Sequence, residues 1–87
     1  MITKNTNAPR TFRRQREAIY ETVKHLFAEA LRTDFTAYTN RADFAQGYGM
    51  LDALKMLGLI SESEMSDRRY ELEKAAKELA REKGWIQ

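Results

Sequence analysis

Apolar residues recur at helical spacing in three segments of the chain. In the first, residues 12–32, they stand three or four residues apart, which predicts an amphipathic helix with one buried stripe. Thr11 comes directly before this pattern and is expected to cap the helix. The apolar positions are Phe12, Ile19, Val23, Leu26, Phe27, Ala30 and Leu31.

The second segment, about residues 41–57, is apolar on two sides of a predicted helix, with Thr39 or Asn40 as its cap. A helix of this kind lies at the centre of a bundle or covers one side with another chain. We therefore expect this helix to be central or to present a docking surface. One side holds Phe44, Tyr48 and Leu51, and the other holds Gly47, Met50, Leu54 and Leu57.

The third segment has a clear helix start. Ser61 and Glu64 have the spacing of a capping box, and Ile60 and Met65 are placed to form a hydrophobic staple around it. This predicts a helix from residue 62 to about residue 83. Gly58 and Gly84 each follow a predicted helix end, where a left-handed residue commonly terminates the helix. The expected buried stripe is Met65, Leu72, Ala75, Ala76 and Leu79.

Together the patterns predict an all-α fold, a three-helix unit with a C-terminal helical hairpin that self-associates. Residues 1–10 hold the only proline and show no periodicity, so they are predicted to be a flexible basic lead before a single helical domain, residues 11–87. The 87 residues are too few for two independent cores. No apolar run exceeds three residues, so the sequence predicts no contact with a membrane.

The composition disfavours one class of function, that of an enzyme. The chain has no cysteine, which excludes disulfides and thiolate sites and fits a reducing, cytoplasmic setting. Its one histidine, His25, stands four residues from both Glu21 and Glu29, but no spacing marks the further ligands that a metal needs. We predict no catalytic residue, no metal and no cofactor, and hence a protein that is not an enzyme.

Charge is distributed unevenly along the chain. Residues 1–16 hold five basic residues and no acidic one, while the other 71 residues hold ten basic and thirteen acidic residues. A basic arm on an acidic body is typical of contact with phosphate or with an acidic protein surface, although a short solvated terminus has the same composition. The candidate anion- or partner-binding residues are Arg10, Arg13, Arg14 and Arg16.

Gly47, Tyr48 and Gly49 form a second candidate, a close-approach surface. Each glycine inside a helix costs about 1 kcal/mol relative to alanine, so two of them in one turn indicate a use. They allow either a neighbouring helix or the backbone of a partner to come close, with the Tyr48 ring as a stacking face.

Arg68 and Arg69 form a secondary patch on the third helix. A short connection between the second and third helices permits a helix-turn-helix, but the would-be recognition helix begins with Glu62 and Glu64, which disfavour phosphate. The aromatic residues exceed what a small core needs, so some are expected at an interface or over helix ends. They are Tyr20, Phe35, Tyr38, Tyr48, Tyr70 and Trp85.

The hairpin over residues 44–80, with the stretch GMLDALKMLGLISESEM from Gly49 to Met65, resembles those of small helical accessory and inhibitor proteins of phages and mobile elements. Members of that class include inhibitors of CRISPR nucleases and oligomeric helical sponges for cyclic nucleotide signals. The resemblance implies a protein that acts by occupying a component of bacterial defence.

The expected function is therefore that of a non-catalytic binding protein whose partner is a protein, a second copy of itself, or both. Two alternatives remain open at this point: a small nucleic-acid-binding regulator that uses the basic arm, and a structural oligomerisation module. Capture of a small nucleotide between the helices is a further possibility.

Overall fold

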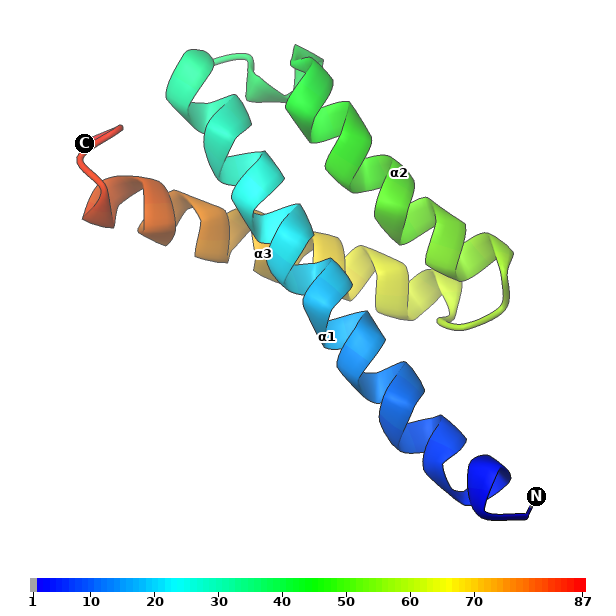
Figure 1. Cartoon of the computed structure of the whole chain (residues 1–87). Coiled ribbons are helices and arrows are strands. Elements are labelled where there is room, and N and C mark those ends of the chain that lie inside the picture. Colours follow the sequence, from blue (N-terminus) through cyan, green and yellow to red (C-terminus); the bar gives the residue numbers. More distant parts are fainter. Residues whose placement is uncertain (1) are drawn as a thin grey trace.

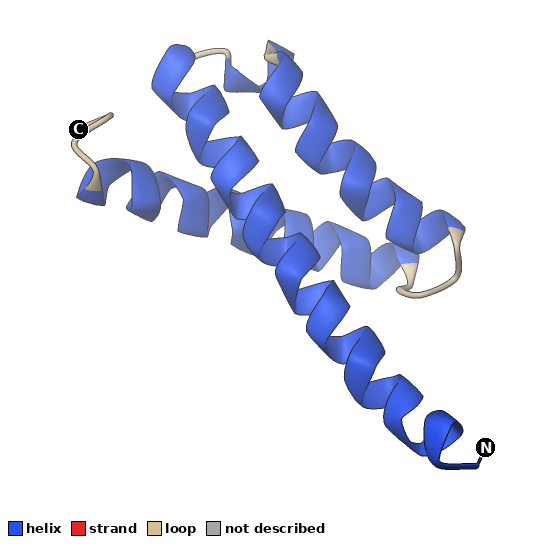
Figure 2. Cartoon of the chain, viewed as in Figure 1, coloured by secondary structure: helices blue, strands red, loops and turns tan. Residues whose placement is uncertain are grey.

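The computed structural model describes the backbone of residues 2–87 and the side chains of residues 12–87. It contains three helices, α1 (Ile2–Thr33), α2 (Ala42–Met56) and α3 (Glu62–Glu82), and a short 3-10 helix, η1 (Tyr38–Asn40). Short loops join the helices, and residues 2–87 contain no strand (Figure 2). The predicted all-α three-helix fold is confirmed.

The first helix begins at Ile2, whereas the sequence predicts a helix from about residue 12 with Thr11 as its cap. Thr11 therefore lies inside the helix, and the segment expected to be a flexible lead is helical from Ile2 onward. Its N-terminal turns project past the other two helices (Figure 1). An amphipathic pattern is needed only where a helix packs on something, and a nucleated helix extends at little cost per residue. The lack of apolar periodicity in residues 1–10 therefore does not mark the end of the helix, which extends to Ile2.

The central helix is α1, so the second helix is not central, which was the first of the two alternatives expected for it. The helices α2 and α3 both pack against α1 and contact each other much less. Along α1 the fully buried residues include Val23, Phe27, Ala28 and Ala30, which cover a wide arc of the helix. The two alanines allow close packing without bulk, so α1 can serve two neighbours although its sequence shows one main stripe.

The core lies where α1 meets the other two helices. Phe27 is completely buried and stacks on Phe44 of α2 with 4.6 Å between the ring centroids. Tyr38 of η1 meets Phe44 edge-on at 5.5 Å. The buried cluster comprises Tyr20, Val23, Phe27, Ala28, Ala30, Leu31, Phe44, Leu51, Leu54, Ile60, Met65 and Ala76.

Both predicted glycine stops are confirmed. Gly58 and Gly84 each have φ +75°, the left-handed conformation that favours glycine. After α3, the N–H of Trp85 donates to the carbonyl of Ala80 at 2.9 Å, and Gly84 donates to Arg81 at 3.0 Å. These paired bonds are the Schellman motif, and Leu59 and Gly58 make the equivalent bonds after α2.

The N-termini of α2 and α3 differ in their capping. Ser61 caps α3 as predicted, because its hydroxyl oxygen accepts from the N–H of Glu64 at 3.0 Å. The predicted staple residues Ile60 and Met65 are both buried. The residue before α2, Arg41, makes no side-chain capping bond, and Thr39 and Asn40 lie in η1 instead of capping α2.

Candidate interaction surfaces

The connection between α2 and α3 exposes a group of large apolar side chains, which we call the tip: Met56, Leu57 and Leu59. Their exposed fractions are 76%, 72% and 42%. The two Schellman bonds around Gly58 hold the chain in a tight turn, so these side chains flank a defined corner. The neighbouring Leu54 and Ile60 are buried, and the core therefore ends at the tip.

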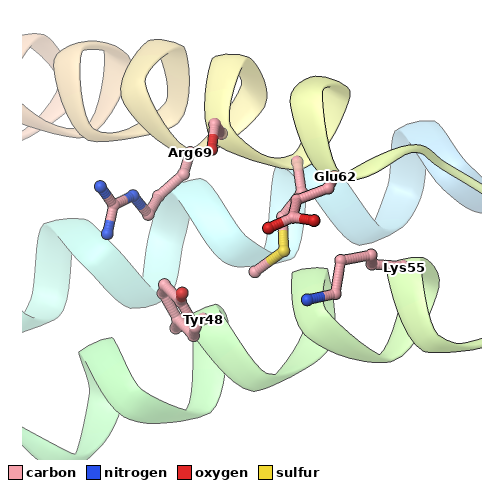
Figure 3. A pocket seen from close by; sticks show the side chains of 6 residues that line it. Tyr48, Lys55, Glu62 and Arg69 are labelled. Atoms are coloured by element: carbon pink, nitrogen blue, oxygen red, sulfur yellow. The ribbon is translucent and has the colours of Figure 1, made fainter.

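A polar hollow of ≈ 130 Å³ lies between α2 and α3, near the tip (Figure 3). Tyr48 and Lys55 line it from α2, and Glu62 and Arg69 from α3. Lys55 is 3.4 Å from Asp52, and the Arg69 Nε is 3.6 Å from Glu73. The hollow thus brings together acidic and basic side chains, and both basic side chains already have carboxylate partners. Its volume is also smaller than that of a typical ligand pocket.

The three residues of the predicted close-approach surface face different surroundings. Gly47 is buried, and a Cβ built on it would lie 2.9 Å from Cε1 of Phe27, so its close approach is to α1 and not to a partner. A Cβ on Gly49 would have no atom within 4 Å. Tyr48 is 37% exposed, with the Arg69 guanidinium 5.6 Å from its ring centroid. The three residues therefore do not form one surface.

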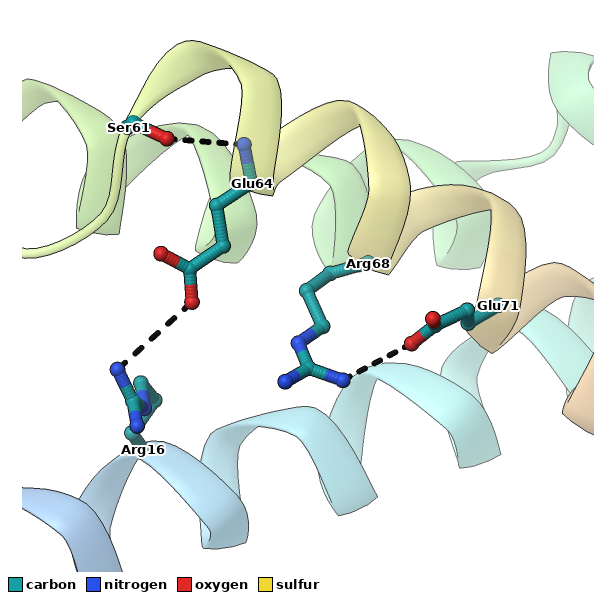
Figure 4. Close-up of polar contacts among 5 residues, drawn as sticks. All are labelled: Arg16, Ser61, Glu64, Arg68 and Glu71. Atoms are coloured by element: carbon teal, nitrogen blue, oxygen red, sulfur yellow. Dashed lines mark hydrogen bonds and ion pairs between the residues drawn. The ribbon is translucent and has the colours of Figure 1, made fainter.

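The four arginines of the predicted basic arm do not share one environment. The side chain of Arg10 lies outside the described side chains, and Arg13 and Arg14 are exposed. Arg16 is half-buried and lies 3.8 Å from Glu64 of α3 (Figure 4). Its guanidinium carbon is 5.3 Å from the ring centroid of Phe12. Arg16 thus joins α1 to α3, which makes it a structural residue and leaves Arg13 and Arg14 as the exposed arginines of this group.

Arg68 and Arg69 do not form the predicted secondary patch. Consecutive residues on a helix point about 100° apart. Arg68 lies over the Tyr20 ring of α1, 5.3 Å from its centroid. It donates to Glu71 at 2.9 Å (Figure 4), whereas Arg69 faces Tyr48 of α2 (Figure 3). Each guanidinium has its own carboxylate one turn further along α3.

Of the surplus aromatics expected from the sequence, Tyr20 belongs to the buried core and Tyr38 is half-buried and packs against it. Tyr20 is 6% exposed, and this burial raises the pKa of its hydroxyl. Tyr38 donates to the carboxylate of Glu73 on α3, and burial together with that bond raises the pKa of Tyr38 to about 12. By contrast, Phe35 and Tyr70 are exposed.

His25 is exposed, and its Nε2 is 3.6 Å from Glu21. Across the described residues, no group of three or more His, Cys, Asp and Glu side chains is placed to hold a metal ion. None of the described helices is long and apolar enough to cross a membrane.

No known family model matches the chain, and no curated protein and no solved structure is significantly similar to it. The candidate surfaces must therefore be judged on their own geometry. Among these surfaces, the tip holds the most exposed apolar side chains, Met56 and Leu57. The sequence analysis did not predict that the tip residues form one surface. Its signal was a glycine stop with two apolar residues before it and two after it, Met56 to Ile60.

Proposed function

We propose that this chain is a non-catalytic binding protein that acts by occupying a partner protein and that its docking surface is the tip. The single observation that carries the proposal is the exposure of Met56, Leu57 and Leu59 on one tight turn. Contiguous apolar residues that remain in water are typical of sites of protein association. The sequence supports the non-catalytic part, since it contains one histidine and no cysteine.

The partner that can be tested without further knowledge is a second copy of the chain. A stable interface buries about 800 Å² on each partner, which is more than three side chains supply. Self-association through the tip is therefore expected to be weak, with a dissociation constant of about 10–500 µM. A larger partner, such as a component of bacterial defence, would have to contact further surface beside the tip.

The nucleic-acid alternative gains no support from three of its arginines. Arg16, Arg68 and Arg69 all lie within 4 Å of carboxylates, and a phosphate would have to displace these to gain a contact. This alternative therefore rests on Arg13 and Arg14, which are exposed. The structural oligomerisation alternative uses the same tip and differs only in having no partner other than itself.

Sedimentation velocity over a range of concentrations tests the tip. Wild-type protein should associate as its concentration rises through the range above, and Leu57→Asp should remain monomeric, because a charge on the tip would have to be desolvated in the interface. We expect a loss of at least tenfold in association, which corresponds to about 1.4 kcal/mol.

Tyr70→Asp is the matched control, since Tyr70 on α3 is as exposed as Leu57, at 71% against 72%. It places the same charge on an equally exposed position away from the tip and should associate like wild type. Association that is lost equally in both variants, or unchanged in Leu57→Asp, contradicts a tip-mediated interface.

A further inference from the structure

The positive charge of the basic arm is not balanced by carboxylates of the chain. Residues 1–16 hold five basic residues and no acidic one. Arg13 and Arg14 are exposed, and neither forms an ion pair with a carboxylate of the described side chains. These two arginines therefore remain available to a negatively charged partner.

The arm has one continuous polar side, which we call the basic face. Positions three and four residues apart lie on the same side of an α-helix, and α1 is helical from Ile2 onward. By this spacing, one side of the arm consists of positions with hydroxyl, amide and guanidinium side chains: Thr3, Thr6, Asn7, Arg10, Arg13 and Arg14. No apolar and no acidic residue interrupts this series.

The shape of the arm fits the major groove of DNA. The N-terminal turns of α1 project past α2 and α3, so a partner can approach them without meeting the other helices (Figure 1). Residues 2–15 span roughly 20 Å at 1.5 Å per residue, and an α-helix with its side chains is about 10–12 Å across. The major groove of B-DNA is about 12 Å wide and admits a helix of this size.

The residue types of the basic face favour DNA over a protein surface. Arginine, threonine and asparagine side chains donate hydrogen bonds to phosphate oxygens and to base edges. The centre of a protein interface is apolar, and the basic face contains no apolar residue. Double-stranded RNA fits less well, because its major groove is deep and narrow.

Glu17 sets the limit of the basic face on the side of the helical body. It is the first acidic residue of the chain, stands four positions after Arg13 and three after Arg14, and is exposed. Its carboxylate would repel phosphates that approach the last turn of the arm. Glu64 of α3 also lies near this turn, but it is paired with Arg16 at 3.8 Å.

We propose that this chain binds duplex DNA through the basic face, with the arm in the major groove and Arg13 and Arg14 on phosphates. Contacts of this kind depend little on base sequence. The arm lies on a different helix from the tip, so the proposal goes beyond the docking function proposed above, and each can fail without the other.

Fluorescence anisotropy of a labelled DNA duplex, about two helical turns long, tests the proposal by titration with the full chain. We expect a dissociation constant of about 10–100 µM at physiological salt. Two phosphate contacts predict a slope of about −1.8 or steeper in the logarithm of affinity against that of salt concentration. Binding should therefore weaken at least about tenfold between 50 and 200 mM salt.

Three single substitutions assign the contact. Arg13→Gln and Arg14→Gln should each weaken binding about tenfold at 50 mM salt and reduce the magnitude of the salt slope by about 1. Glu17→Gln should strengthen binding about two- to fivefold, because it removes a repulsive charge.

Arg81→Gln is the matched control. Arg81 is also an exposed arginine, but it lies near the C-terminal end of α3, far from the arm (Figure 1). Its loss changes the net charge by the same amount and should leave binding unchanged, since a distant charge is screened by salt. Thermal unfolding of each variant verifies that the fold is retained.

The proposal is overturned if binding does not depend on salt, or if Arg13→Gln and Arg14→Gln bind like Arg81→Gln. Glu17→Gln binding no more tightly than wild type also contradicts it. Duplex RNA of the same sequence and polyglutamate should bind at least about fivefold more weakly. RNA that binds as tightly as DNA would refute the major groove, and polyglutamate that does so would assign the basic face to an acidic protein.

Discussion

Phe27→Ala is expected to lower the free energy of unfolding by about 3–5 kcal/mol, the usual cost of removing a buried aromatic ring. Phe27 has no exposed surface, stacks on Phe44 at 4.6 Å, and lies against Gly47. Because this ring joins α1 to α2, its removal leaves a cavity at the centre of the bundle. Urea unfolding followed by circular dichroism measures the change.

Phe35→Ala is the control for this prediction, because Phe35 is 53% exposed and its truncation should change the stability by less than about 1 kcal/mol. If Phe27→Ala is too unstable to fold, Phe27→Leu retains part of the buried volume and should give an intermediate loss. Equal effects of the Phe27 and Phe35 truncations would contradict the assignment of Phe27 to the core.

The second large effect is a difference in stability between alanine substitutions at two glycines of α2. Gly47→Ala and Gly49→Ala both gain about 1 kcal/mol of helix propensity. At Gly47 the new methyl group would lie 2.9 Å from Cε1 and 3.2 Å from Cδ1 of the buried Phe27 ring, whereas at Gly49 it would meet open space. Overpacking of this kind costs about 1–3 kcal/mol.

Both variants gain the same helix propensity. The difference between their free energies of unfolding therefore measures the cost of overpacking at Gly47. Gly49→Ala should be more stable than wild type, and Gly47→Ala should be less stable than Gly49→Ala by about 1–3 kcal/mol. Thermal or urea unfolding of the two variants measures this. If both substitutions stabilise equally, α1 and α2 do not approach as closely at Gly47 as the structure shows.

The features that could be predicted from the sequence are those that depend on a few neighbouring residues. The Ser61 cap and the left-handed Gly58 and Gly84 were predicted because the hydrogen bonds that favour them join residues three to five positions apart. The buried stripe of α3 was predicted in part for the same reason, since its periodicity is local. Met65 and Ala76 are buried as expected, but Leu72, Ala75 and Leu79 are only half-buried, and the buried Ala80 was not predicted.

The central position of α1 could not be predicted from stripe width. It depends on how closely two helices approach a third, and small residues such as Ala28 and Gly47 determine that distance without adding to any hydrophobic pattern. The start of α1 at Ile2 was missed because residues 1–10 show no apolar periodicity, and periodicity was the signal used to predict a helix.

The candidate patch on α3 was wrong for a different reason. Counting cations suggested a patch at Arg68 and Arg69, but Glu71 and Glu73 stand within one turn and neutralise them. That signal was present in the sequence as i,i+3 and i,i+4 spacing. The pocket lined by Leu31, Phe35 and Trp85 depends on two helix ends that are distant in sequence, and only the glycine stop at Gly84 was predicted there.

The most direct measurement of the central claim is NMR of methionine methyl groups over a concentration series. Met56 belongs to the tip and is 76% exposed, while Met65 is 5% exposed inside the same molecule. If chains associate through the tip, the Met56 methyl signal shifts as concentration rises and the Met65 signal stays in place. A Met56 signal that does not move, or one that moves no more than that of Met65, would show that the tip is not where this protein meets another.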